Sequence, residues 1–317
     1  MNKKMWLIIL LVSVGWVAVS GQAGVEQALA LFSADSNIMV EYSEEGQAQL
    51  EEAIVLLKEA LGIPARLDET NKETLMAFPI NPEKKDLATK LSQAYYTLAD
   101  VFFRREPNRV METHIKGRNW GFKSLRMNPA FVVLEQQEGF LVAVRAETDL
   151  AALYWTKVNW MRIAELDMMA AVRGRIPPQA KVLAERTLEL DASFMNYGPY
   201  RTLGAFWSGL PSDPISPLFI GGLRQDFDRA LSYLCRVVDE PEFCVAHAEL
   251  VNPTVDEYFE NRVFFVKFYL IPLEHWAAAV RILESVLEDP IGETYILYNA
   301  FYQEIARELL KEVRANL

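Results

Sequence analysis

Side chains suited to acid–base or metal chemistry are few in this sequence. The three histidines, His114, His247 and His275, do not have the spacing of a metal site. His247 and Glu249 match the His-x-Glu of zinc deaminases, but the cysteine pair that such a site needs downstream is absent. The chain also lacks a Gly-x-Ser-x-Gly motif and a phosphate-binding P-loop motif. We therefore expect no catalytic activity, no metal and no cofactor.

Two cysteines, Cys235 and Cys244, lie nine residues apart around a predicted helix-to-helix turn at Pro241. An even number of cysteines in an exported protein permits a disulfide bond. The two side chains are either bridged across this corner or packed as small buried apolar groups. Both interpretations assign the cysteines a structural role.

A predicted helix over 150–168 has apolar residues on two of its sides, which is typical of a helix that is buried or that lines a groove. Asn159 and Arg162 would add polar contacts to an otherwise apolar cleft, as in many ligand pockets. The alternative is a helix sandwiched inside a core. Our hypothesis for the ligand- or partner-binding residues is the set Trp155, Asn159, Trp160, Tyr200 and Trp207.

The stretch GPYRTLGAFWSGLP, residues 198–211, predicts a close contact between two helices. The spacing of Tyr200, Leu203, Gly204 and Trp207 places all four on one helix face. Because Gly204 is small and central on that face, a second helix can approach it closely. Leu203 and Gly204 are therefore predicted to be structural residues.

The first 23 residues have the pattern of a secretory signal. Lys3 and Lys4 precede an apolar run from Trp6 to Val19, and small residues follow it. The run is shorter than the roughly 20 apolar residues of a membrane span, so an uncleaved anchor is the alternative. The early residues contain no cysteine for lipid attachment. The net charge of −11 argues against nucleic acid as a partner. We expect a periplasmic protein.

Helical periodicity extends over most of residues 24–317, which we expect to form a single all-α domain. A β-hairpin over 131–144 is a weaker alternative for that one segment. Tyr200-x2-Leu203-Gly204-x2-Trp207 matches the first half of the tetratricopeptide pattern, with its two aromatic residues exchanged. Tyr95-x2-Leu98-Ala99-x2-Phe102 matches it again. Such matches predict tetratricopeptide-like helical-hairpin repeats that stack into an α-α superhelix.

Several stretches occur together in one order: HIKGRNWGFKSLRMNP, LYWTKVNWMRIAELD, ERTLELDASF, GPYRTLGAFWSGLP, GGLRQDFDRAL and HWAAAVRILESVLEDP. Because these stretches occur in this order, residues 45–315 resemble the T component of tetratricopeptide-associated TRAP transporters, the TatT family. The resemblance implies an exported, all-helical protein that associates with a periplasmic TRAP-type solute-binding protein. The absent lipoprotein cysteine departs from the family pattern.

These observations predict an accessory transport protein that docks a solute-binding protein and holds an apolar ligand. A general cell-envelope scaffold with tetratricopeptide-like repeats, unrelated to transport, is the alternative. The sequence identifies neither the solute nor the oligomeric state, and a homo-oligomer stays open.

Overall fold

The computed structural model describes residues 22–33, 37–213, 215–247 and 255–317. Over these ranges the chain is helical, and its β-structure is limited to one isolated antiparallel bridge between Phe32 and Ile38. The predicted all-α class is therefore confirmed. The predicted signal sequence lies, as far as residue 21, outside the described residues, so export stays a prediction.

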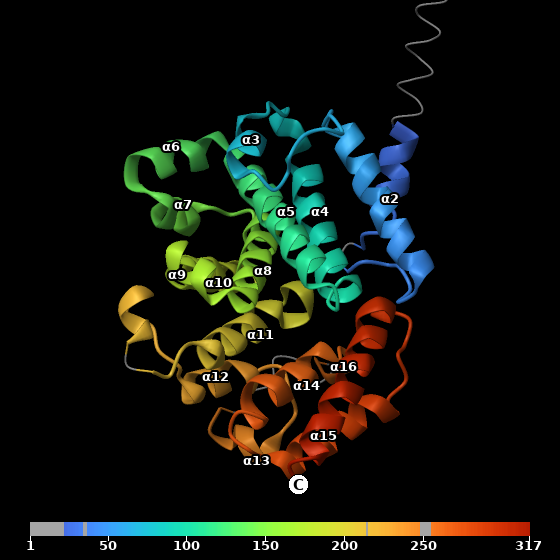
Figure 1. Cartoon of the computed structure of the whole chain (residues 1–317), viewed down its shortest axis with the longest axis vertical. Helices are drawn as coiled ribbons and strands as arrows, with labels where there is room; N and C mark the ends of the chain where they lie inside the picture. Colours follow the sequence, from blue (N-terminus) through green and yellow to red (C-terminus); the bar gives the residue numbers. More distant parts are fainter. Residues whose placement is uncertain (1–21, 34–36, 214, 248–254) are drawn as a thin grey trace, which may run out of the picture.

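The chain forms an N-terminal and a C-terminal group of helices, which occupy the upper and lower parts of Figure 1. After a short helical segment at 22–29, the N-terminal group contains α2 (Glu44–Ala60), α3 (Lys72–Ala77), η1 (Pro82–Lys84), α4 (Lys85–Thr97), η2 (Leu98–Phe102), α5 (Pro107–Arg126), α6 (Pro129–Glu138), α7 (Phe140–Ala146), α8 (Leu150–Leu166), α9 (Met168–Arg173) and α10 (Ile176–Leu190). The C-terminal group contains α11 (Phe194–Gly209), η3 (Ser216–Phe219), α12 (Phe227–Leu234), α13 (Pro241–Cys244), η4 (Val245–His247), η5 (Val255–Glu257), α14 (Glu260–Phe265), η6 (Val266–Leu270), α15 (Trp276–Glu288) and α16 (Ile296–Arg314).

Helix starts follow local capping chemistry that is visible in the sequence. The side chains of Ser43, Asp149 and Asp226 accept hydrogen bonds from backbone N–H groups in the first turns of α2, α8 and α12. The hairpin considered for 131–144 is wrong, because the segment forms helices α6 and α7. Asn128 caps α6 and Pro129 occupies its first turn, so the helix start outweighs the valines that follow.

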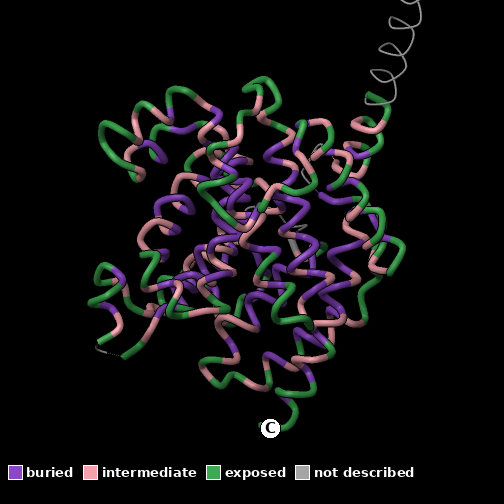
Figure 2. Tube along the Cα trace, turned by 45° about the horizontal axis from the view of Figure 1, so that its top comes forward, coloured by how far each residue is buried: buried purple, intermediate pink, exposed green. Residues whose placement is uncertain are grey.

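Helix α8 is the central element of the N-terminal group, where it packs against α4, α5 and α10. Helix α11 packs against α10 on one side and against α12 and α14 on the other, and so joins the two groups. In Figure 2 the buried residues fill the interior of both groups without a break. The main apolar cluster also extends from α2 to α16, so the two groups share one core.

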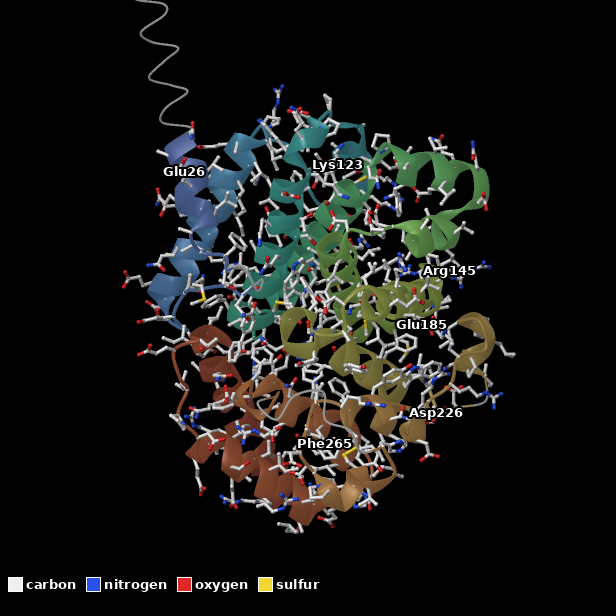
Figure 3. All side chains as sticks on the ribbon, turned by 180° about the vertical axis from the view of Figure 1, so that it is seen from behind. Glu26, Lys123, Arg145, Glu185, Asp226 and Phe265 are labelled. Carbon is white, nitrogen blue, oxygen red and sulfur yellow. A yellow bond between two sulfur atoms is a disulfide. The ribbon has the colours of Figure 1, made fainter. Side chains whose placement is uncertain are left out.

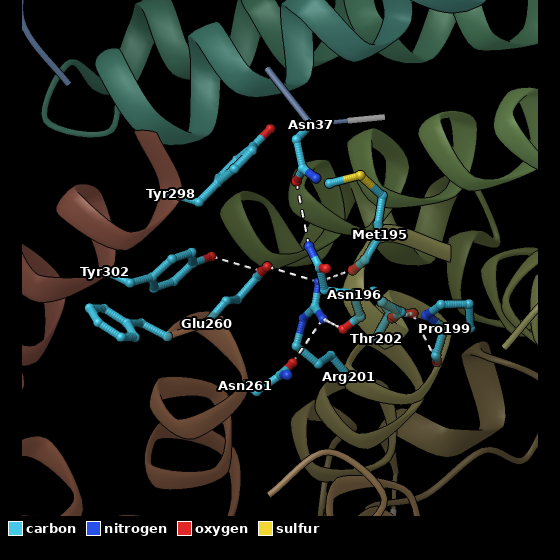
Figure 4. A network of polar contacts seen from close by, with 12 residues as sticks. Asn37, Met195, Asn196, Pro199, Arg201, Thr202, Glu260, Asn261, Tyr298 and Tyr302 are labelled. Carbon is cyan, nitrogen blue, oxygen red and sulfur yellow. Dashed lines mark hydrogen bonds and ion pairs between the residues drawn. The ribbon is translucent and has the colours of Figure 1, made fainter. Parts of the chain in front are cut away.

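The start of α11 departs from helical geometry. Met195, Asn196 and Tyr197 have left-handed backbone angles, with φ of 51°, 52° and 64°. The Arg201 side chain donates to the carbonyl oxygens of Met195 and Asn196 and pairs with Glu260 of α14, its Nη2 lying 2.9 Å from Glu260 Oε2 (Figure 4). Arg201 therefore ties the strained turn to α14.

Candidate functional site

A partly enclosed depression lies between the two groups of helices, and we call it the seam groove. It has a volume of about 410 Å³. One wall comes from η2, α5 and α8, and the other from α14, η6 and α16. Its apolar lining consists of Val110, Leu166, Val263, Phe264, Phe301, Ile305 and Leu309. Its charged lining consists of Asp100, Arg104, Arg162, Glu165, Lys267, Glu308 and Glu312.

Two π-helical turns supply residues to opposite walls of this groove. Asp100 belongs to η2, which continues α4, and Lys267 belongs to η6, which continues α14. A π turn carries an extra residue compared with an α turn, so it changes which side chains point toward a neighbouring helix. Such turns are uncommon and occur frequently at functional sites. Their coincidence at one groove singles it out as the candidate site.

The charges of the wall formed by η2 and α8 are paired, partly with Lys267 of the opposite wall. Arg162 binds Asp100 through two nitrogens, with Nε–Oδ1 and Nη2–Oδ2 distances of 2.8 and 3.1 Å. Its Nη1 lies 2.7 Å from Glu165, and Lys267 lies 3.2 Å from the same carboxylate. The adjacent Arg162 guanidinium, with help from Lys267, lowers the pKa of Glu165 to about 2. The wall is thus a fixed, ion-paired surface rather than a set of free charges.

His114 on α5 gives the groove an unused hydrogen-bond acceptor. The side chain is 1% exposed, and its Nδ1 lies 3.2 Å from Oδ1 of Asn159. The Asn159 amide donates to the carbonyl oxygens of Ser92 and Trp155, so its Oδ1 is the atom left to accept from His114. This pattern assigns the proton to Nδ1 and leaves the lone pair of Nε2 without a partner among the described residues.

Burial keeps this imidazole neutral. The pKa of His114 falls to about 4 because the surrounding apolar groups disfavour the charged form. A neutral Nε2 beside apolar side chains suits a ligand that has an apolar body and one hydrogen-bond donor. The groove does not suit a highly charged ligand, because its arginines are already paired with carboxylates.

A second depression, of about 730 Å³, lies near Glu69 but is shallow and wide. The oxygens of Glu69 are occupied by Lys58, by the Tyr95 hydroxyl at 2.8 Å and by Trp120 Nε1 at 2.6 Å. These contacts make Glu69 a structural residue that joins three segments.

The aromatic groove expected from the sequence is wrong. Trp155 packs in the main cluster, Trp160 in a second cluster and Trp207 in a third, and each is at most 7% exposed. Asn159 is buried as well, and Tyr200 is half-buried near Tyr233. The physical reason is that α8 is covered on several sides, so its apolar faces belong to the core. Of the polar residues expected in a cleft, Arg162 does line one.

The residues predicted to be structural lie at packed positions in the C-terminal group. A Cβ atom on Gly204 would lie 2.5 Å from Cγ of Leu234, so α12 crosses α11 at this glycine. Leu203 is fully buried on the same helix. Cys235 and Cys244 form a disulfide with a Cα–Cα distance of 5.4 Å, visible near Phe265 in Figure 3.

Sequence reasoning missed His114 and Asp100 as groove residues. One signal was available: Gly117 and Gly121 follow His114 at helical spacing, and both let α8 approach α5 closely, with Asn159 against Gly117. That pattern would have placed His114 at the contact with α8, although it would not have shown the cavity on the other side.

No protein-family model matches the chain, and a search of curated proteins found no match. Across the described ranges, His, Cys, Asp and Glu side chains form no group of three or more that could hold a metal ion. In the same ranges, every helix is too short or too polar to cross a membrane.

Proposed function

We propose that the protein is a periplasmic, non-catalytic accessory component of a TRAP-type transporter. In this role it docks a solute-binding protein and holds a small, largely apolar solute in the seam groove. The observation that carries the proposal is the Nε2 of His114, which has no partner among the described residues, at a cavity of about 410 Å³ that is lined by apolar side chains and by ion-paired charges. This volume lies within the range of small-molecule pockets, roughly 300–1,000 Å³.

Two further observations support the proposal. The segments that resemble the TatT family include α8, which supplies Arg162 and Glu165 to the groove. Helices packed as sequential pairs, α4 with α5, α11 with α12, and α15 with α16, agree with tetratricopeptide-like hairpins. Six of the seven charged groove residues pair with one another, which favours binding over catalysis.

The ligand part of the proposal is tested with two probes that differ in one hydrogen-bond donor, 2-naphthol and 2-methoxynaphthalene. The wild-type protein should bind 2-naphthol about five- to tenfold more tightly, since a hydrogen bond contributes about 1 kcal/mol. His114→Phe should remove that preference, and His247→Phe should keep it. Fluorescence titration measures the affinities, and circular dichroism checks folding. Equal affinities for both probes in the wild type would contradict the assigned acceptor.

The docking part of the proposal is tested by calorimetric titration with the TRAP-type solute-binding protein encoded beside this protein. We expect a dissociation constant in the micromolar range or below for an accessory component. An absence of binding would favour the alternative of a general envelope scaffold, whatever the result with the naphthalene probes.

A further inference from the structure

A second surface of the molecule has exposed apolar side chains. In the described residues, twelve large apolar side chains are well exposed, and five of them come from α9 and the segment around η3. They are Met168, Met169, Ile215, Leu218 and Phe219, with exposed fractions from 59% to 77%. We call this set the apolar corner. Such a concentration is unusual, because scattered single residues are the norm on a protein surface.

The two segments lie side by side. Val172 of α9 packs against the cluster that contains Ile220, directly after η3. A Cβ atom on Gly221 would also lie within 3.7 Å of Pro178 in α10. In Figure 1 the segment between α11 and α12, which contains η3, lies beside α9 at one edge of the molecule. The exposed side chains therefore belong to one region of the surface.

The η3 segment is held in shape by its own contacts. Pro217 and Ile220 are buried and anchor it, whereas Leu218 and Phe219 between them are exposed. The N–H of Gly222 donates to the carbonyl of Pro217 at 2.8 Å, and that of Gln225 donates to Pro211 at 3.2 Å. The tip thus presents its two apolar side chains without first having to fold.

Three arginines lie on the segments of the apolar corner. Arg173, Arg175 and Arg224 are exposed and form no ion pair within the described part of the chain. Three carboxylates on the same segments bind backbone N–H groups. Asp167 caps α9, Asp226 caps α12, and Asp213 accepts from the N–H groups of Ile215 and Ser216. Unpaired, exposed arginines beside apolar side chains favour an anionic partner.

We propose that the apolar corner is a membrane-contact surface, which inserts Leu218 and Phe219 into the interface of a bilayer rich in anionic phospholipid. The methionines of α9 lie beside them, and the three arginines contact the headgroups. Apolar side chains bordered by basic ones are typical of proteins that lie on membranes. A lipid surface is favoured over a protein partner because a projecting tip enters a soft interface without needing a complementary pocket. The inference is independent of the ligand in the seam groove.

The test uses the full chain with a cysteine at position 218, introduced as Leu218→Cys and labelled with a nitrobenzoxadiazole dye. Val55→Cys is the control, because Val55 is 53% exposed on α2 at the opposite side of Figure 1. The fluorescence emission of the label at 218 should move to shorter wavelength when vesicles of equimolar phosphatidylglycerol and phosphatidylcholine are added. Vesicles of phosphatidylcholine alone should move the emission less. The label at 55 should not shift. Because each label reports its own surroundings, membrane binding by the apolar run 6–19 does not decide the result.

Substitutions test the two kinds of contact separately. Replacing each of the three arginines by Gln should weaken partitioning about fivefold per residue at low salt. The double change Leu218→Ser and Phe219→Ser should weaken it at least about tenfold, and both positions are exposed, so folding is retained. Equal shifts at 218 and 55, or no shift at 218, would overturn the proposal. A shift at 218 caused by the solute-binding protein but not by vesicles would also overturn it and would identify a protein-docking site.

Discussion

At the scale of single residues, His114 determines how stability responds to pH. Its pKa is about 4 in the folded protein and close to 6.5 in an unfolded chain. Between these values the unfolded state binds more protons, so stability rises with pH. The contribution of His114 to the free energy of unfolding is fully present above pH 6.5 and is lost as the pH falls to 4. It amounts to about 3 kcal/mol.

We therefore predict that the free energy of unfolding falls more steeply from pH 6.5 to 4 in the wild type than in His114→Phe. Urea unfolding at a series of pH values measures both slopes. Burial raises the pKa of Asp256 to about 6, which has the opposite effect on stability. Asp256 is present in both proteins, so its effect cancels when the two slopes are compared. Parallel slopes would show that His114 does not titrate as a buried group. His247→Phe is the control and should follow the wild type.

The role of His114 could not be read from the sequence for a physical reason. Its tautomer depends on Asn159, 45 residues later, and the orientation of Asn159 depends on the carbonyl of Ser92. Contacts of this kind have no signature in local spacing. Gly204 did have a signature in the sequence, because a small residue between bulky ones on a helix face is sufficient to predict a close helix crossing.

At the scale of elements, the contact between α11 and α12 depends on the absence of a side chain at Gly204. Gly204→Leu should destabilise the protein by about 1–3 kcal/mol or more, because the new side chain would overlap Leu234. Gly209→Leu is the matched control, since it places the same side chain at the end of the same helix, with nothing within 4 Å of its Cβ. Thermal unfolding compares the two variants. A control that melts as low as Gly204→Leu would disprove the crossing as the cause.

The disulfide joins the end of α12 to α13 across a separation of nine residues. Because the closed loop is short, its loss should cost only about 2–3 kcal/mol. The variant with both Cys235→Ala and Cys244→Ala should therefore stay folded at room temperature and unfold at lower denaturant concentration. Treatment of the wild type with a reductant should reproduce the shift, and should leave the double variant unchanged. A reductant effect on the variant would point to another cause.

Most long helices could be predicted from periodicity and stop signals, but the π turns could not. The sequence predicts a helix over 87–103, and the structure has α4 continued by η2 there. The insertion of one residue into a turn depends on what packs against it. Phe102 of η2 packs against Tyr42, which also packs against Phe301 from the far end of the chain. This is why the sequence analysis expected Arg162 in a cleft but not its partner Asp100.

At the scale of the whole molecule, the buried pair of Arg201 and Glu260 connects α11, the helix that joins the two groups, to α14. Glu260 also accepts from the Tyr302 hydroxyl at 2.8 Å, so α16 takes part in the same connection. Arg201→Met should cost about 3–5 kcal/mol, because it leaves the carboxylate buried without its cation. Arg105→Met, which removes ion pairs with Glu304 and Glu308 from an arginine that is 69% exposed, should change stability much less.

Denaturant titration of both variants checks this expectation. Adding Glu260→Gln to Arg201→Met should recover part of the loss, because the buried charge is then removed. A double variant no more stable than Arg201→Met alone would show that the guanidinium acts through its bonds to Met195 and Asn196 and not through the carboxylate.

The left-handed turn at Met195–Tyr197 also has a consequence for the order of events during synthesis. Non-glycine residues rarely adopt this conformation unless their surroundings enforce it. Arg201, which holds two of their carbonyls, meets Asn261 about 60 residues later in the chain. A polypeptide that emerges N-terminus first therefore completes α8 long before it can fix the turn. We expect the N-terminal helices to assemble early, and the cavity between the two groups to exist only after the last helix has arrived.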